Sequence, residues 1–202
     1  MNEINYDKQM QAFLQGKEGK RLLLHSCCAP CSSHCLSELA GKIRVTVLYY
    51  NPNLDCKEEY EKRKSEQIRF LDETGLADFL DCDYAKADYD AISCGLEQER
   101  EGGARCAKCF ELRLRKTAKT AKENGFDCFG TTLTVSPLKN AKLINKIGLQ
   151  IAKEEGVDYL PSDFKKRSGY LHSIQLSQEY RLYRQNYCGC VFSKRQREEE
   201  TK

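Results

Sequence analysis

The sequence predicts an α/β fold: one parallel sheet of about five strands with helices on its faces. Apolar, β-branched segments alternate with helix-patterned segments five times along the chain, an order typical of a parallel sheet with right-handed crossovers. The chain contains no internal repeat and no domain linker. The first strand leads directly into a turn with three cysteines, at the place where open α/β sheets bind ligands.

Runs of apolar, β-branched and aromatic residues mark the five strands. Leu22-Leu23-Leu24 forms the first, and Pro52 ends the second because proline cannot continue a central strand. The predicted strands, in chain order, span residues 21–26, 44–50, 79–83, 128–135 and 157–160.

Apolar residues at helical spacing separate these strands. Asp55 and Glu58 resemble a capping box, and Gly75 ends the helix that they begin. Gly125 and Gly156 end two later helices in the same way. The predicted helices, in chain order, span residues 32–40, 55–74, 87–96, 106–124, 141–155 and 169–186.

One catalytic domain over residues 21–193 is expected, with a flexible leader over 1–20 and a charged, disordered tail over 194–202. The net charge of +3 neither demands nor excludes a nucleic-acid partner. No apolar run approaches the roughly 18 residues of a membrane helix. The polar first twenty residues do not resemble a signal peptide, so a cytoplasmic protein without membrane contact is expected.

Twelve cysteines are the unusual feature of the composition. A small secreted disulfide scaffold would explain them, but the length, the absence of a signal peptide and the many lysines and glutamates argue against it. In a reducing cytosol such cysteines are typically metal ligands or redox groups.

Seven of the cysteines fall into three blocks: Cys27-Cys28-x-x-Cys31, Cys106-x-x-Cys109 and Cys188-x-Cys190. One Cys-x-x-Cys pair alone would be a redox pair or one arm of a zinc site. A cubane iron–sulfur cluster takes four thiolates, and the remaining three are too few to close a tetrahedral structural site. The count therefore indicates a cluster plus a second metal with an open position, although a structural or redox role remains an alternative. Cys27 and Cys28 are adjacent, so they could serve two different centres.

Other candidate residues lie near these blocks in the predicted fold. His25 precedes the first block, and Asp163 follows the fifth strand at the ligand-binding edge of the sheet. Basic residues interleaved with tyrosines suit RNA, although a solvated helix face is equally consistent with them. The basic candidates are Lys165, Lys166, Arg167, Arg181 and Arg184.

Six motifs in the same chain resemble one known family, the cobalamin-independent epoxyqueuosine reductases (QueH), over residues 20 to about 193. They are His-x-Cys-Cys-Ala-Pro-Cys at 25–31, Tyr-Tyr-Asn-Pro-Asn at 49–53, Cys-x-x-Cys-Phe-x-x-Arg-Leu at 106–114, Thr-Thr-Leu-Thr-Val-Ser-Pro-x-Lys at 131–139, Ser-Asp-Phe-Lys-Lys at 162–166 and Tyr-Arg-Gln-Asn-Tyr-Cys-Gly-Cys at 183–190.

The resemblance implies a Rossmann-like fold related to PP-loop nucleotide enzymes. It also implies an oxidoreductase that reduces the epoxide of epoxyqueuosine at the tRNA wobble position, the last step of queuosine synthesis, with electrons from an external donor. A [4Fe-4S] cluster and a second metal, iron, are implied as cofactors. Matched motif by motif, it assigns Cys27, Cys28, Cys106 and Cys109 to the cluster.

That assignment leaves Cys31, Cys188 and Cys190 for the second metal, at the catalytic centre. Asp163 or His25 is expected to supply a proton to the epoxide oxygen. The basic candidates named above are expected to contact the tRNA.

Two rival functions remain open at the level of sequence. A PP-loop-type tRNA thiolation enzyme needs a glycine-rich loop after the first strand, where this chain has Ser26-Cys27-Cys28-Ala29. A zinc-stapled RNA-binding module would contain zinc without iron or labile sulfide.

Overall fold

The computed structural model describes residues 4–200, so the ends of the predicted leader (1–3) and tail (201–202) lie outside the described residues. Five parallel strands form one sheet in the order β3-β2-β1-β4-β5, which confirms the predicted α/β fold. The strands are β1 (Arg21–His25), β2 (Arg44–Leu48), β3 (Asp78–Leu80), β4 (Cys128–Thr131) and β5 (Asp158–Tyr159).

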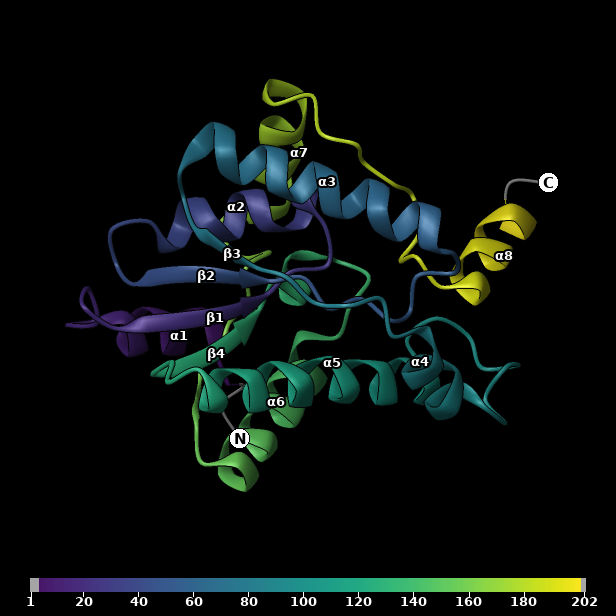
Figure 1. Ribbon diagram of the computed structural model, residues 1–202, viewed down its shortest axis with the longest axis horizontal. Coiled ribbons are helices and arrows are strands. Elements are labelled where there is room, and N and C mark those ends of the chain that lie inside the picture. Colours follow the sequence, from purple (N-terminus) through teal and green to yellow (C-terminus); the bar gives the residue numbers. More distant parts are fainter. Residues whose placement is uncertain (1–3, 201–202) are drawn as a thin grey trace.

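Helices cover both faces of the sheet. In Figure 1, α2, α3 and α7 lie on one side, while α5 and α6 lie on the other. The helices are α1 (Tyr6–Leu14), α2 (Ala29–Leu39), α3 (Lys57–Thr74), α4 (Lys86–Ser93), α5 (Ala104–Glu123), the short 3-10 helix η1 (Thr132–Val135), α6 (Ala141–Glu155), α7 (Gly169–Glu179) and α8 (Val191–Glu200).

The central strand β1 is apolar throughout because both of its faces are buried. Leu22 and Leu24 pack with Phe70 of α3 in the core on the α2 and α3 side. Leu23 points to the opposite face and packs with Leu114 of α5. This arrangement fixes the position of the turn that follows β1.

The ends of the domain are more ordered than the sequence analysis expects. Residues 6–14 form α1, which buries Met10 and Leu14 in the core, in place of a flexible leader. Residues 191–200 form α8 in place of a disordered tail. The missed signal for α1 is the i, i+4 spacing of Tyr6, Met10 and Leu14, its three buried residues.

Several predicted elements end earlier than expected, and two of these ends shape the site. The Thr131 hydroxyl accepts a hydrogen bond from the Leu133 amide, so η1 begins there and the predicted strand 128–135 stops at Thr131. Helix α7 ends at Glu179, and Arg181 has a φ of +50°. Residues 180–190 therefore return as an irregular segment toward the carboxyl edge of the sheet. Within residues 4–200, no helix is both long and apolar enough to cross a bilayer.

Candidate metal centre

The turn after β1 gathers three thiols at the N-terminus of α2. Cys28 is the extended N-cap residue, and Cys31 lies in the first turn of the helix. The sulfur atoms of Cys27, Cys28 and Cys31 all lie within 4.8 Å of one another, and Cys27 Sγ is 4.0 Å from Cys28 Sγ. Thiolates around one tetrahedral ion with bonds of about 2.3 Å lie about 3.8 Å apart. This N-terminal thiol group therefore fits a single metal ion with one position open.

A buried polar network holds this turn in place. The Gln67 side-chain oxygen accepts hydrogen bonds from Ser26 Oγ at 2.7 Å and Ser32 Oγ at 2.9 Å. Asn51 Nδ2 donates to the Ser26 carbonyl at 2.8 Å. All four side chains are buried, so the turn is fixed by neutral hydrogen bonds on both sides.

Hydrogen bonding within the N-terminal thiol group separates the three pKa values. Bonds from Cys28 and Cys31 hold the pKa of the Cys27 thiol well below its usual range, and the same bonds raise the pKa of the two donors. Cys27 is therefore the first of the three to become a thiolate, the form that binds metal.

Four further thiols line a second, smaller cavity. Cys106 and Cys109 lie in the first two turns of α5, and Cys188 and Cys190 come from the irregular C-terminal segment. We call these four residues the C-terminal thiol group. The Gly102 amide donates to Cys106 Sγ at 3.2 Å, and the Ser193 amide donates to Cys190 Sγ at 3.4 Å. Four thiols around one cavity match the number that a cubane cluster takes.

Burial raises the pKa of two thiols in the C-terminal group: that of Cys109 reaches about 12, and that of Cys106 also rises. Even with the Arg113 guanidinium nearby, this pKa keeps Cys109 protonated at neutral pH. A metal centre would convert both thiols to thiolates.

Three buried arginines supply positive charge next to the thiols. Arg63, Arg105 and Arg113 are 3%, 1% and 1% exposed, and each has one guanidinium nitrogen without a hydrogen-bond partner. Arg113 donates to the Cys109 carbonyl, and within residues 4–200 it has no carboxylate partner. A buried cation is costly unless an anion faces it. Thiolates carrying a metal cluster are such an anion, so the arginines and the C-terminal thiol group fit an iron–sulfur cluster.

The backbone of the irregular segment 180–190 packs closely against the loop after β2 at Gly189. Its φ is +118°, and an added Cβ would collide with the Leu54 side chain. The Gly189 carbonyl accepts a hydrogen bond from the Asp55 amide at 3.1 Å. Arg63 Nη1 donates to the Cys188 carbonyl at 3.5 Å. The loop after β2 thus positions both thiols of this segment.

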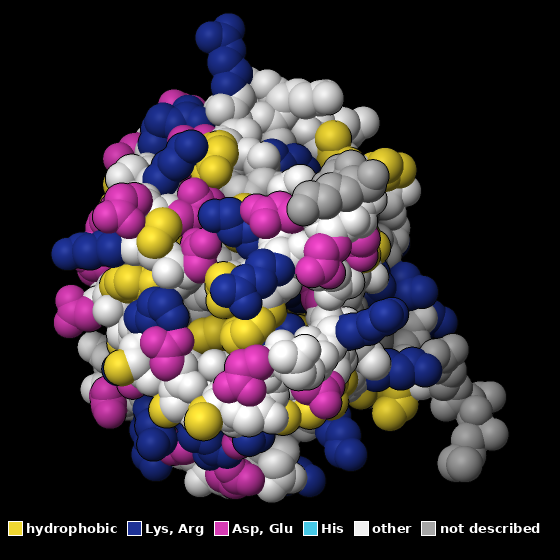
Figure 2. Space-filling view, turned by 90° about the vertical axis from the view of Figure 1, so that its right-hand side faces the viewer, with side chains coloured by type: hydrophobic (Ala, Val, Ile, Leu, Met, Phe, Trp, Pro, Cys, Tyr) yellow, Lys and Arg dark blue, Asp and Glu magenta, His cyan; other side chains and the backbone are white. Residues whose placement is uncertain are grey.

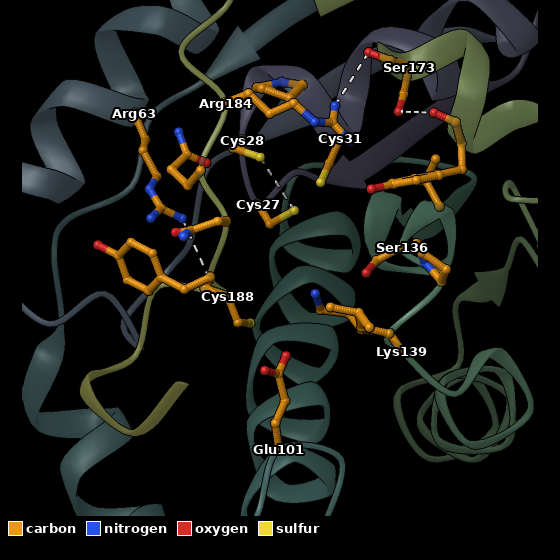
Figure 3. A pocket seen from close by; sticks show the side chains of 18 of the residues that line it. Cys27, Cys28, Cys31, Arg63, Glu101, Ser136, Lys139, Ser173, Arg184 and Cys188 are labelled. Carbon is orange, nitrogen blue, oxygen red and sulfur yellow. Dashed lines mark hydrogen bonds between the residues drawn. The ribbon is translucent and has the colours of Figure 1, made fainter. Parts of the chain in front are cut away.

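A cavity of about 160 Å³ connects the two thiol groups. Cys27, Cys28, Cys31 and Cys188 all line it (Figure 3). Its ionisable lining residues other than cysteine and tyrosine, within the described chain, are Arg63, Glu101, Lys139, Arg184 and Arg197. The close-up shows the Lys139 ammonium pointing into the space between Cys31 and Cys188.

The site residues predicted from the sequence do not include Arg63, Glu101, Arg105, Arg113 or Lys139. Arg113 and Lys139 belong to quoted motifs, and that membership is the signal that could have found them. Burial would lower the pKa of Lys139, but the facing thiols of Cys188, Cys27 and Cys31 raise it above its usual value. Lys139 thus stays charged in the cavity.

The predicted proton donors do not line this cavity. The ring of His25 is fully buried: Nε2 donates to the Tyr50 carbonyl, and Nδ1 accepts from the Thr131 hydroxyl. Burial lowers its pKa to about 3, so the ring is neutral. Asp163 forms an ion pair with Lys165 at 2.6 Å. Their role in proton transfer stays a prediction.

The five predicted tRNA contacts are spread over the structure. Arg184 lines the cavity and lies over the Tyr170 ring. Arg167 instead pairs with Asp7 and Glu38, while Lys166 and Arg181 are exposed. Figure 2 shows the face at the α4 and α8 end of the molecule, where lysine and arginine are mixed with acidic side chains.

The division of the thiols predicted from motif matching differs from their grouping in space. It pairs Cys27 and Cys28 with Cys106 and Cys109, whereas the structure places Cys31 with the first two and Cys188 and Cys190 with the second two. None of the twelve cysteines, all within the described residues, forms a disulfide.

The chain matches one protein family and is similar to several known proteins. The family model described as "Epoxyqueuosine reductase QueH" matches residues 22–196. A protein of that name from Staphylococcus epidermidis is 42% identical over 95% of this chain and 85% of its own length. Another from Streptococcus pyogenes is 45% identical over 95% and 78%, and one from Thermotoga maritima is 34% identical over 89% and 93%.

One solved structure has a similar fold at low sequence identity. It is the U34-tRNA thiolase NcsA from Methanococcus maripaludis with its [4Fe-4S] cluster, with a TM-score of 0.54 and 11% identity, covering 92% of this chain and 67% of that one. This likeness concerns the fold alone.

Proposed function

The chain belongs to the QueH family of epoxyqueuosine reductases, and from this premise we propose how its thiol site reduces epoxyqueuosine in tRNA. The family match confirms the resemblance predicted from the motifs, and the protein is an oxidoreductase. The observation that carries the proposal is the arrangement of seven thiols in two groups, which one cavity connects through Cys188. We propose a cytoplasmic setting, supported by the family's tRNA substrate.

We propose that the cofactors divide according to the spatial grouping. The C-terminal thiol group would hold the [4Fe-4S] cluster, supported by its four thiols and by the buried arginines. The N-terminal thiol group would hold a second iron, supported by the spacing of its sulfur atoms. The division expected from motif matching, with Cys27 and Cys28 on the cluster, is the alternative.

Reduction of the epoxide to an alkene removes its oxygen as water and consumes two electrons and two protons. When bound, an iron–sulfur cluster supplies single electrons and a metal with an open position supplies Lewis acidity. An external one-electron donor must therefore act twice per turnover. Within the chain, the buried guanidinium groups of Arg63 and Arg113 would balance the negative charge of the thiolates. Tyr170 and Tyr187 line the cavity that would receive the modified base.

Contact with the tRNA would begin at Arg184, which lies at the cavity. Lys165, Lys166, Arg167 and Arg181 would then neutralise phosphates beyond the modified nucleotide. The mixture of charges on the face in Figure 2 supports recognition through a local set of contacts rather than a uniformly basic surface.

The first test measures iron, zinc and acid-labile sulfide after anaerobic purification, followed by turnover on epoxyqueuosine-containing tRNA. More than four irons with four sulfides per chain are expected, together with loss of one oxygen from the nucleoside, measured by mass spectrometry. Zinc without iron or sulfide would contradict the proposal and favour the RNA-binding module.

Two cysteine variants separate the two divisions of the thiols. If the spatial grouping is followed, Cys190→Ala loses most of the visible cluster absorbance, whereas Cys28→Ala keeps it and loses turnover. The division expected from motif matching gives the opposite pair of results. Cys94→Ala, an exposed cysteine outside both groups, is the matched control and should change neither quantity.

A further inference from the structure

Lys139 is the lysine that points into the cavity between the two thiol groups. Its backbone amide donates to the Ser136 carbonyl at 3.2 Å, which closes a turn after η1. The next residue, Asn140, caps α6 by accepting a hydrogen bond from the Leu143 amide. The backbone on both sides of Lys139 is therefore fixed, and its ammonium reaches the cavity from a rigid base.

Within residues 4–200 the ammonium has neither a hydrogen bond nor a carboxylate partner, and the thiols of Cys27, Cys31 and Cys188 face it. Arg63 donates to Glu59 and to the Cys188 carbonyl, and Arg113 donates to the Cys109 carbonyl. Those guanidinium groups already donate hydrogen bonds to other groups of the protein. Lys139 keeps three N–H donors for whatever occupies the cavity.

The neighbouring carboxylate does not neutralise this charge. Glu101 also lines the cavity, and the ion-pair partner found for it is Arg197, at 4.0 Å. A half-buried ammonium without a carboxylate partner favours a ligand that is, or becomes, negatively charged.

We infer that Lys139 is a further catalytic residue, whose ammonium donates a hydrogen bond to the epoxide oxygen and stabilises the negative charge that develops there. The inference rests on the proposed function. When each C–O bond breaks, its electron pair stays on oxygen. Two electrons, delivered singly by the external donor, complete the alkene, and two protons from water convert the oxygen to water. Lys139 keeps its own proton throughout.

The test compares Lys139→Met, which keeps most of the length of the side chain without its charge, with Lys139→Arg. Exposed Lys146 on α6 provides the control, Lys146→Met. Turnover, iron and sulfide content, and binding of an epoxyqueuosine-containing anticodon hairpin to the metal-free protein are measured for each. The hairpin binding gives a readout that does not depend on the loaded enzyme.

Lys139→Met should lower kcat by about 100-fold or more, the loss typical of removing one donor to a developing oxyanion. KM, hairpin binding and iron content should stay near wild type, because the interaction strengthens only as the C–O bond breaks. Lys139→Arg should recover part of kcat, and Lys146→Met should match wild type.

An unchanged kcat in Lys139→Met, with an active wild type, would overturn the inference alone. A loss of iron or of hairpin binding in proportion to the loss of kcat would also overturn it, because Lys139 would then hold the cofactor or the substrate. An inactive but fully loaded wild type would instead overturn the proposed function, and the inference with it.

Discussion

The two thiol groups are connected by one cavity but are held by different kinds of structure. The N-terminal group lies on the turn between the central strand β1 and α2, and neutral hydrogen bonds through Gln67 fix that turn. The C-terminal group combines the start of α5 with an irregular segment, and buried arginines surround it.

The difference separates two ways of preparing a metal site. Close spacing and a rigid turn prepare the N-terminal group for one ion, and Arg63 and Lys139 lie at the cavity beside it. The C-terminal group depends on charge, because its buried thiols ionise only where arginines and a metal compensate for burial. Removing charge should therefore damage one group, and removing a neutral hydrogen bond should damage the other.

Arg113→Met gives the largest expected effect. The guanidinium is 1% exposed and faces the C-terminal group without a carboxylate partner in the described chain. Removing one member of a buried charge pair costs about 3–5 kcal/mol, so iron and labile sulfide should fall to a small fraction of the wild-type content. The metal-free protein should be as stable as wild type or more stable, because an uncompensated buried charge has been removed.

The control for this variant lies two residues further along α5. Arg115 pairs with Glu111 and Glu154 on the surface, so Arg115→Met should cost less than about 1 kcal/mol in the free energy of unfolding. It should retain the full iron content. Wild-type iron and sulfide in Arg113→Met would show that the C-terminal group does not depend on buried charge.

The sheet and the seven thiols of the two groups could be predicted from the sequence. The parallel sheet follows from the alternation of segments, and the seven thiols follow from their spacing. Spacing shows that thiols within a block lie close together, but not which blocks meet. That depends on the path of residues 180–190, an irregular segment fixed by single contacts such as the bond from Asp55 to Gly189.

The charged residues of the site were harder to recognise for a related reason. An arginine on an amphipathic helix normally faces solvent, and only the packed structure shows that Arg113 is buried. In contrast, the predicted basic contacts were chosen by clustering in sequence, which does not show that Arg167 also pairs with carboxylates of α1 and α2.

Gln67→Leu tests the N-terminal group and has the next largest effect. The change removes the acceptor that the hydroxyls of Ser26 and Ser32 share in a fully buried site, and leaves them only the longer bonds to the carbonyls of Cys28 and Ala29. We expect a loss of about 1–3 kcal/mol in the free energy of unfolding, measured by urea denaturation of the metal-free protein. Cluster absorbance should be largely retained, since the C-terminal group is not touched.

Gln150→Leu is the matched control, because Gln150 is exposed on α6 and bonds only to Glu154. It should change the free energy of unfolding by less than about 0.5 kcal/mol. Loss of cluster absorbance in Gln67→Leu, without loss of stability, would mean that the two groups are not held independently.

The smallest effect concerns the far end of α2, away from the thiols. Burial would raise the pKa of the Glu38 carboxyl, but Lys42, Arg167 and Gln11 lower it to about 2. A lowered pKa in the folded state stabilises the protein above the ordinary value of 4.5, and this contribution is lost as the pH falls toward 2. The difference in unfolding free energy between wild type and Glu38→Gln should therefore shrink between about pH 5 and about pH 2.

That difference should not exceed about 1 kcal/mol, because the partners of Glu38 are partly exposed. Exposed Glu123 on α5 serves as the control, and the difference for Glu123→Gln should vary less with pH. A difference for Glu38→Gln that stays constant with pH would show that the ion pairs of Glu38 do not stabilise this end of α2. If it shrinks as expected, acid loosens the end of α2 that is held by charge, while the end held by Gln67 keeps the N-terminal thiol group in place.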